Sequence, residues 1–256
     1  NTLTYLNQTH MHHNATSLSN PVVAITGAAD GIGWATAQLF AARGWRVALL
    51  DMNGDKARER AQALGQHHMG VLCDVTDEAQ ASAAMAQVVA QQGRLDALVN
   101  NAGIGDQAVP TLQQTADAFD RVLSVHLRGA FLMTQAALAH MQTQGRDAKG
   151  NRGAIVNIGS IASTSGIPGR NAYSAAKAGI LGMTRALATE WARKGIRVNA
   201  VAPGYVATAL VADLAEKGAI NAAAIVQRTP LGRMAEPAEI AETIFFLASP
   251  AASYVT

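Results

Sequence analysis

Two residues four positions apart, Tyr173 and Lys177, have the types and spacing most suited to acid–base chemistry. They lie in an Ala-rich stretch that predicts a helix, so both side chains project from one face and can touch. A free tyrosine has a pKa near 10, and its use as a base at neutral pH requires that pKa to fall by about 2 to 3, which costs roughly 3 to 4 kcal/mol. The ammonium group of Lys177 acts in that direction. Ser160, thirteen positions before Tyr173, can donate a hydrogen bond to a substrate oxygen that is becoming a carbonyl or an alkoxide.

Each of these residues also has a purely structural interpretation. A tyrosine on an Ala-rich helix usually packs, a lysine four residues later is usually solvated, and Ser160 can cap the end of a strand. Their chemical interpretation therefore depends on a second signal elsewhere in the chain.

That signal is a glycine-rich loop, TGAADGIG over residues 26–33, between a short apolar run and a predicted helix. Glycines lack the Cβ that would keep a backbone away from a pyrophosphate, and a helix N-terminus offers free N–H groups to phosphates. A tight turn with close helix packing is the alternative interpretation. Asp51 ends the next strand, where a carboxylate can accept hydrogen bonds from the adenosine ribose or cap the turn before Asn53.

The charges near this loop favour NAD over NADP. A 2′-phosphate beside Asp51 would meet a like charge, and Asp30 inside the loop adds a second one.

The elements that must position these residues alternate along the chain. Apolar runs too hydrophobic for a half-exposed sheet predict buried strands at residues 22–26, 46–50, 70–73, 95–99, 154–158 and 196–201. Helical patterns lie between them at Ile32 to Arg43 and at residues 55–64, 77–92, 113–142 and 171–194. The predicted fold class is therefore α/β, a Rossmann-like doubly wound parallel sheet with helices on both faces. Since no linker interrupts the pattern, residues 21–256 are expected to form a single domain.

Composition narrows the classes of protein. The chain has 256 residues, of which 49% are hydrophobic, enough for a large core, and a net charge of +2 without basic clusters, which gives no footprint for nucleic acid. No apolar run reaches the length of a membrane span. The charged fraction of 15% is low, which favours a surface covered by other subunits. The single cysteine, Cys73, excludes an internal disulfide and fits a reducing, cytoplasmic setting.

Residues 1–20 are polar and lack the pattern of a signal peptide, so we expect a flexible leader or a remnant of expression. They include His10, His12 and His13, but no acidic or cysteine ligand lies near them in the sequence. We therefore predict no metal site.

The glycine loop occurs together with Asn100-Asn101-Ala102-Gly103, Ser160, Tyr173-Ser-Ala-Ala-Lys177 and Pro203-Gly204, and this set resembles the short-chain dehydrogenase/reductase family over residues 22–256. The resemblance implies hydride transfer to NAD, with Tyr173 removing the hydroxyl proton, Ser160 orienting the oxygen and Lys177 binding the nicotinamide ribose. It further implies that Asp74 and Val75 flank the adenine and that Val206 and Thr208 lie near the carboxamide. The cofactor-binding set it implies is Gly27, Asp30, Gly31, Ile32, Gly33, Asp51, Asp74, Val75, Asn100, Ala102, Gly103, Tyr173, Lys177, Pro203, Gly204, Val206 and Thr208.

His126 departs from the family pattern. The segment Val125 to Phe131 has histidine where the family has a catalytic asparagine. The imidazole is either a structural replacement, which we favour, or a member of the proton relay, in which case it titrates near pH 6.5.

The chain end is a second departure, because Ser253-Tyr254-Val255-Thr256 stands where the family continues into a last strand. Either native residues follow Thr256 or the edge strand comes from elsewhere.

The substrate side is the least informative part of the sequence. Residues 205–215 are small and apolar with Asp213 as the one charge, which favours a small to medium neutral secondary alcohol or ketone, or a polyol. The alternatives are an NADPH-dependent 3-oxoacyl-thioester reductase and a non-catalytic dinucleotide-binding sensor or scaffold. Relatives of this kind also lead us to expect a homotetramer assembled through the helices at 113–142 and 171–194.

Overall fold

The computed structural model describes residues 20–216, 218 and 220–256, which form one α/β domain. Six parallel strands make a single sheet in the order β3-β2-β1-β4-β5-β6. The strands are β1 (Val22–Thr26), β2 (Arg46–Asp51), β3 (Met69–Leu72), β4 (Ala97–Asn100), β5 (Gly153–Ile158) and β6 (Ile196–Val201). The predicted Rossmann-like fold is confirmed. The predicted leader, including His10, His12 and His13, lies outside the described residues apart from Asn20.

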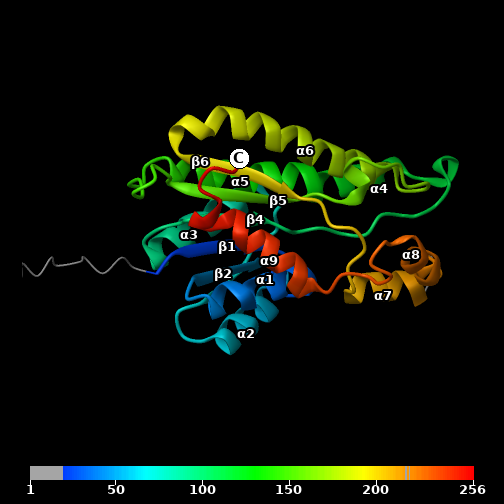
Figure 1. Ribbon diagram of the computed structural model, residues 1–256, viewed down its shortest axis with the longest axis horizontal. Helices are drawn as coiled ribbons and strands as arrows, with labels where there is room; N and C mark the ends of the chain where they lie inside the picture. The colour runs from blue at the N-terminus through cyan, green and yellow to red at the C-terminus, as the bar shows by residue number, and fades with distance from the viewer. Residues whose placement is uncertain (1–19, 217, 219) are drawn as a thin grey trace, which may run out of the picture.

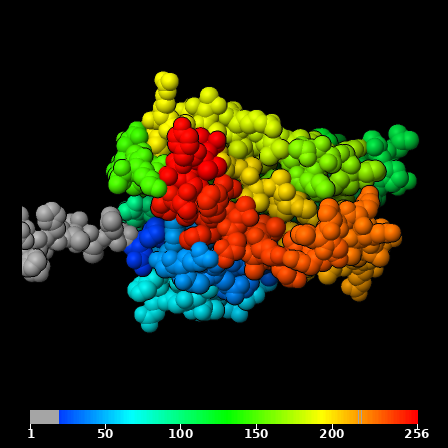
Figure 2. Space-filling view, viewed as in Figure 1, coloured from blue at the N-terminus to red at the C-terminus, as the bar shows by residue number. Residues whose placement is uncertain are grey.

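Helices cover both faces of the sheet (Figure 1). One layer consists of α3 (Glu78–Gln92), α4 (Ala116–Leu123), α5 (Gly129–Met141) and α6 (Asn171–Trp191), and the other of α1 (Gly31–Ala42), α2 (Gly54–Leu64) and α9 (Pro237–Ala248). Two short helices, α7 (Ala209–Glu216) and α8 (Ala222–Arg228), lie together at one end of the molecule, where the space-filling view shows them projecting as a lobe (Figure 2). Short 3₁₀ turns occupy Thr111–Gln113, Ile161–Ser163, Ala192–Lys194 and Pro250–Ala252.

The alternation of strand side chains explains why both faces are covered. Val22 and Ala24 of β1 belong to the core cluster under α3 and α5, whereas Val23 and Ile25 belong to the cluster under α1 and α9. All four side chains are fully buried. A strand that buries both faces needs a helical layer on each side.

The helix predicted over residues 113–142 is not continuous. A π-helical turn over Ser124–Arg128 separates α4 from α5 and contains His126. π-turns inside helices occur often at functional sites, because the extra residue turns a side chain out of the regular pattern.

The described residues also contain one helical stretch, Ala116–Met141, that is long and apolar enough by composition to cross a membrane. Half of its most apolar window is buried inside the fold. It is therefore a core helix of this domain.

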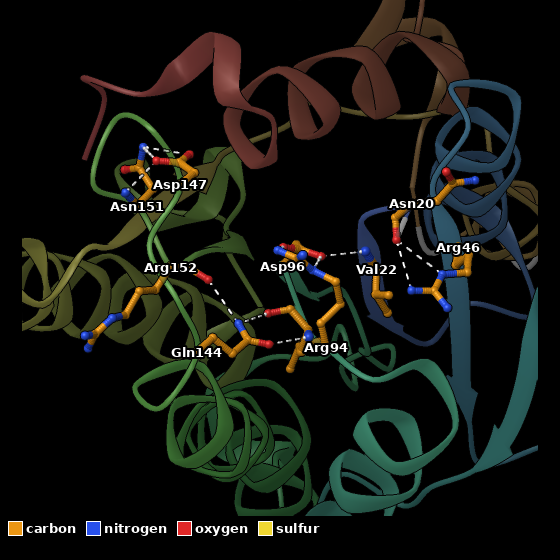
Figure 3. Close-up of polar contacts among 10 residues, drawn as sticks. Asn20, Val22, Arg46, Arg94, Asp96, Gln144, Asp147, Asn151 and Arg152 are labelled. Carbon is orange, nitrogen blue, oxygen red and sulfur yellow. Dashed lines mark hydrogen bonds and ion pairs between the residues drawn. The ribbon is translucent and has the colours of Figure 1, made fainter. Parts of the chain in front are cut away.

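Side chains close the amino ends of the strands (Figure 3). The Asp96 carboxylate accepts from the backbone N–H of Val22 at 2.8 Å and from the Arg94 guanidinium. The Gln144 side chain accepts from Leu95 N–H at 2.7 Å and donates to Leu95 C=O at 2.8 Å. Side-chain hydrogen bonds therefore satisfy the backbone groups of Val22 and Leu95 at the amino ends of β1 and β4.

Gly70 allows β3 to approach α2. A Cβ at this position would overlap the backbone of Ala57 and Arg58 in α2. We expect Gly70→Ala to lower the free energy of unfolding by at least about 2 kcal/mol, because backbone cannot move aside as a flexible side chain does. Urea unfolding followed by circular dichroism measures the change.

Gly182→Ala is the matched control, because a Cβ there would meet nothing within 4 Å and the residue lies in α6. It should stabilise the protein by about 0.5 to 1 kcal/mol. Equal unfolding free energies for the two variants would contradict the packing argument.

Candidate active site

The candidate site is a cavity of about 400 Å³ at the carboxyl ends of the strands. Strand order reverses between β1 and β4, and ligands of open α/β sheets bind in the crevice that such a reversal leaves. The loops after these two strands are joined by hydrogen bonds. Thr26 Oγ1 accepts from the N–H groups of Asn101 and Ala102, and the Asn101 amide donates to the carbonyls of Thr26 and Gly27, all at 3.0 Å.

The glycine loop has the backbone geometry of an anion cradle. Gly27 and Gly31 have φ values of +62° and +55°, a region that side chains disfavour. A Cβ at Gly33 would overlap the carbonyl oxygen of Gly27. The Asp30 side chain precedes α1 but makes no cap, so N–H groups of the first turn remain available to a phosphate.

Two carboxylates line the cavity near this loop, Asp30 and Asp51. Asp51 accepts from Ala29 N–H at 3.1 Å and Asn53 N–H at 2.9 Å, so it braces the loop as well as facing the cavity. Asp30 forms an ion pair with Lys56 at 2.6 Å. Lys56 balances the charge of Asp30, which leaves Asp51 as the lining carboxylate near this loop without an ion pair among the described residues.

Ser160, Tyr173 and Lys177 line the same cavity, as their spacing predicted. The Lys177 ammonium donates to the Ile158 carbonyl at 2.6 Å and lies 5.7 Å from the centre of the Tyr173 ring. The Ser160 hydroxyl lies close enough to Tyr173 to lower the pKa of its phenol, and it accepts from Ala162 N–H at 3.1 Å, so Ser160 both caps a turn and lines the cavity. The capping role of Ser160 is therefore compatible with its expected role as a hydrogen-bond donor to the substrate.

Burial controls the protonation of this group. It raises the pKa of Tyr173, while the Ser160 hydrogen bond and the Arg170 charge lower it to a smaller extent. Burial also lowers the pKa of Lys177 to about 8. For the protein chain alone, the net shift of the Tyr173 pKa is upward, because the cost of burying a phenolate outweighs the nearby charges.

His126 is buried against Tyr173. The two rings meet edge to face at 5.3 Å and 88°. Its Nε2 lies 2.8 Å from the carbonyl oxygen and 3.1 Å from the amide nitrogen of Ile104. Nδ1 has no partner among the residues that the structure describes. A Cβ at Gly103 would lie 2.5 Å from the imidazole Cε1, so Gly103 provides room for the ring.

Burial, with a smaller contribution from the Lys177 charge, lowers the pKa of His126 to about 3. The imidazole is therefore neutral at physiological pH. This favours the structural replacement over the relay, since a neutral ring that pins Ile104 has no charge change to contribute near pH 7.

Asn100 faces away from the cavity into a buried network. Its amide donates to Asn157 Oδ1 at 2.8 Å and Thr134 Oγ1 at 2.9 Å, and Asn157 donates to Thr184 Oγ1 at 2.9 Å. These contacts join β4, β5, α5 and α6. The neighbouring Asn101, which the sequence analysis did not select, lines the cavity instead.

Four other predicted cofactor residues lie outside the cavity lining: Gly33, Asp74, Val75 and Ala102. Asp74 accepts from Thr76 N–H and Oγ1 at 2.9 and 2.8 Å, and Val75 packs against Gly129. Their roles toward the adenine stay predictions. The predicted residues that do line it are Gly27, Asp30, Gly31, Ile32, Asp51, Gly103, His126, Ser160, Tyr173, Lys177, Pro203, Gly204, Val206 and Thr208.

Arg170 is a lining residue that the sequence analysis missed. The available signal was its position three residues before Tyr173 at the start of α6. Within the described residues no group of three or more potential metal ligands lies together.

Comparisons with known proteins find relatives over most of the chain. A family model described as enoyl-(acyl carrier protein) reductase matches residues 27–256. An uncharacterized short-chain type dehydrogenase/reductase of Sinorhizobium fredii is 42% identical over 92% of this chain, which spans only 41% of that protein. Cis-4-hydroxycyclohexanecarboxylate dehydrogenase of Sinomonas cyclohexanicum is 45% identical over 91% of both chains.

A solved structure is also similar to the fold. It is 3-ketoacyl-(acyl-carrier-protein) reductase from Brucella melitensis complexed with NADH, with a TM-score of 0.86 and 34% identity, covering 94% of this chain and 95% of that one.

The neutral state of His126 predicts the pH dependence of the His126→Asn variant. Between pH 6 and 7.5 the pH–rate profiles of the two proteins should superimpose, because the His126 imidazole does not titrate there. An ionisation near pH 6.5 that is present in the parent protein and absent in the variant would contradict this.

Stability gives a second measurement. A histidine whose folded pKa is below its unfolded value destabilises the fold as pH falls below about 6.5, because the unfolded chain binds the extra proton. From pH 7 to 5 the parent protein should lose about 2 kcal/mol more unfolding free energy than His126→Asn. Urea titrations at both pH values measure this difference.

Proposed function

Because the chain belongs to the short-chain dehydrogenase/reductase family, we propose that it is an NAD-dependent oxidoreductase that interconverts a secondary alcohol and its ketone. The observation that carries the proposal is the convergence of Ser160, Tyr173 and Lys177 with the glycine loop on one cavity. The intact trio argues against a non-catalytic sensor or scaffold.

The residues present fit a nicotinamide dinucleotide. In this proposal the open N–H groups around Gly31 and Ile32 hold the diphosphate, Asp51 the adenosine ribose and Lys177 the nicotinamide ribose. Val206 and Thr208 lie on the wall expected to face the carboxamide. When bound, the dinucleotide supplies the acceptor of the hydride, or its donor in the reverse direction.

The chain's own residues handle the proton. Ser160 donates a hydrogen bond to the substrate oxygen, and Tyr173 takes the hydroxyl proton as the C–H bond yields its electron pair and the C=O bond forms. Arg170 and Ser160 favour the phenolate form of Tyr173 against burial. His126 holds Ile104 and the edge of the Tyr173 ring in place.

The cavity wall favours a compact substrate. Ile161, Ile167, Leu210, Leu214 and Ile220 make it largely apolar beyond Ser160. An alcohol or ketone of small to medium size is consistent with this wall. The similarity to a 3-ketoacyl-(acyl-carrier-protein) reductase keeps a 3-oxoacyl thioester as the second candidate, and that relative was solved with NADH.

Activity tests the proposal directly. NADH formation is measured with cis-4-hydroxycyclohexanecarboxylate, neutral secondary alcohols and polyols, and NADH oxidation with a 3-oxoacyl thioester. Tyr173→Phe keeps the ring and deletes the ionisable hydroxyl, so turnover should fall at least about a hundredfold while NADH affinity changes little.

Tyr254→Phe is the matched control, because Tyr254 is fully exposed and far along the chain from the cavity residues. It should keep the parent rate. A Tyr173→Phe enzyme that remains active would refute the assignment of the base.

Cofactor preference should depend on Asp51. We expect NADH to bind at least about tenfold more tightly than NADPH, a difference of about 1.4 kcal/mol. Asp51→Ala combined with Met52→Arg should narrow or reverse it, because a repelling carboxylate is replaced by a cation. Calorimetric titration measures both affinities, with Asp55→Ala as a control at an exposed carboxylate of the same region. Equal affinities in the parent protein would rule out the preference.

We also propose a homotetramer. An apolar hollow on the outer surface is lined by Leu123, Leu127, Phe131 and Met183 of α4, α5, α6 and the π-turn, and Phe131 is 48% exposed. Phe131→Glu should shift the mass measured by light scattering toward a smaller species, since a buried charge opposes association. A monomer mass for the parent protein at micromolar concentration would contradict this assembly.

A further inference from the structure

Arg170 is a charged residue of the cavity lining, and the proposed proton transfer does not use the hydrogen-bond donors of its guanidinium group. It is the residue preceding α6, three positions before Tyr173 and seven before Lys177. Tyr173 and Lys177 lie on one face of α6, and all three residues line the cavity.

The Arg170 guanidinium has no hydrogen-bond or ion-pair partner in the described part of the chain, and the side chain is half-buried. The carboxylate that reaches this helix turn, Asp106, accepts instead from the N–H groups of Tyr173 at 3.0 Å and Gln107 at 2.7 Å. A half-buried arginine therefore retains five unused N–H donors.

Arg170 and Tyr173 line the same cavity, and the charge of Arg170 is close enough to lower the Tyr173 pKa to a small extent. The carboxylates of the cavity lining, Asp30 and Asp51, lie at the glycine loop. Asp51 ends β2, and three strand spacings, about 14 Å, separate β2 from β5, beside which Tyr173 lies. Asp30 is already paired with Lys56 at 2.6 Å. Neither carboxylate of the cavity lining forms an ion pair with Arg170.

The surrounding wall makes a free cation costly. Ile161, Ile167 and Leu210 are among its apolar residues. A cation in such a setting gains most from an anion that brings its own oxygen acceptors, and guanidinium groups bind carboxylates and similar oxyanions through two parallel hydrogen bonds.

We propose that Arg170 binds an oxyanionic group of the substrate, a carboxylate or a sulfonate, so that the substrate is a hydroxy acid or the matching keto acid. This inference rests on the proposed function. An acidic substrate replaces the neutral one that the apolar segment at 205–215 predicted. That segment does not include Arg170, which immediately precedes α6.

The test compares paired probes on each enzyme. The probes are cis-4-hydroxycyclohexanecarboxylate, the corresponding sulfonate and the neutral carboxamide, and the enzymes are the parent protein, Arg170→Gln, Arg170→Lys and Arg185→Gln. The carboxylate-to-carboxamide and sulfonate-to-carboxamide ratios of kcat/KM are the readouts, because a ratio within one enzyme cancels any effect of Arg170 on the Tyr173 pKa. Arg185 is an exposed arginine of the same helix outside the cavity lining.

In the parent protein at least one acid should be preferred over the carboxamide by about tenfold or more, and which acid it is identifies the oxyanion. Arg170→Gln should abolish that preference mainly through KM, Arg170→Lys should retain part of it, and Arg185→Gln should keep it. A parent enzyme without the preference, or one whose preference survives in Arg170→Gln, would overturn the inference.

A binding measurement separates this inference from the proposed function. Cyclohexanecarboxylate and cyclohexanesulfonate carry the anion but no hydroxyl to oxidise. Calorimetry should show that at least one of them binds the enzyme–NADH complex and that Arg170→Gln weakens it at least tenfold. Binding that depends on Arg170 without turnover of any alcohol would refute the dehydrogenase and support the anion site, whereas turnover of neutral alcohols with no such binding would do the reverse.

Discussion

The junction between Thr26 and Asn101 is the contact on which the arrangement of the site depends. Through it the loop after β1 and the loop after β4 are held together at the point where the strand order reverses. Gly27 belongs to this junction, and a Cβ at Gly33 would lie 2.6 Å from the Asn101 amide nitrogen. Two residues later Gly103 receives the His126 ring, which in turn contacts Tyr173. Gly27 and Gly33 are therefore required by this junction and Gly103 by the neighbouring His126 ring, so that the phosphate cradle and the candidate base are positioned from adjacent contacts.

Burial then determines which groups at the site carry charge. It raises the pKa of Tyr173, lowers that of Lys177 to about 8 and lowers that of His126 to about 3. Each change favours the neutral form, because a low dielectric opposes charge of either sign. Arg170 lines the cavity beside these groups, and among the described residues no hydrogen bond or ion pair engages its side chain. Because a guanidinium binds carboxylates and similar oxyanions through paired hydrogen bonds, Arg170 is the feature of the pocket most able to select a substrate by charge.

The sequence was sufficient for the fold and for most of the cavity lining. Strands predicted from apolar runs agree with the structure to within two residues, because a buried parallel strand is uniformly apolar and bounded by turns. It was insufficient where one position decides which way a side chain points. Asn100 pairs in register with Asn157 and joins the buried network, whereas the adjacent Asn101 turns to the cavity. Two identical neighbours cannot be distinguished without the register of β4 on β5. The pKa of His126 and the π-turn that carries it likewise depend on packing against α6 and Ile104, which no local pattern encodes.

Backbone N–H and C=O groups are satisfied differently at the amino ends and at the carboxyl ends of the strands. At the amino ends Asp96 and Gln144 occupy the N–H and C=O groups of Val22 and Leu95 with side chains. At the carboxyl ends the loop before α1 leaves its first-turn N–H groups without a side-chain cap, although Asp30 stands at the capping position. Asp30 turns to Lys56 instead. A helix end that forgoes a cap gives up about 1 kcal/mol, which an anion bound at those N–H groups can restore. Side chains thus satisfy backbone groups at the amino ends of the strands, whereas at the carboxyl ends the first turn of α1 stays open beside the Thr26–Asn101 junction. An anion bound there would complete the hydrogen bonding of that turn.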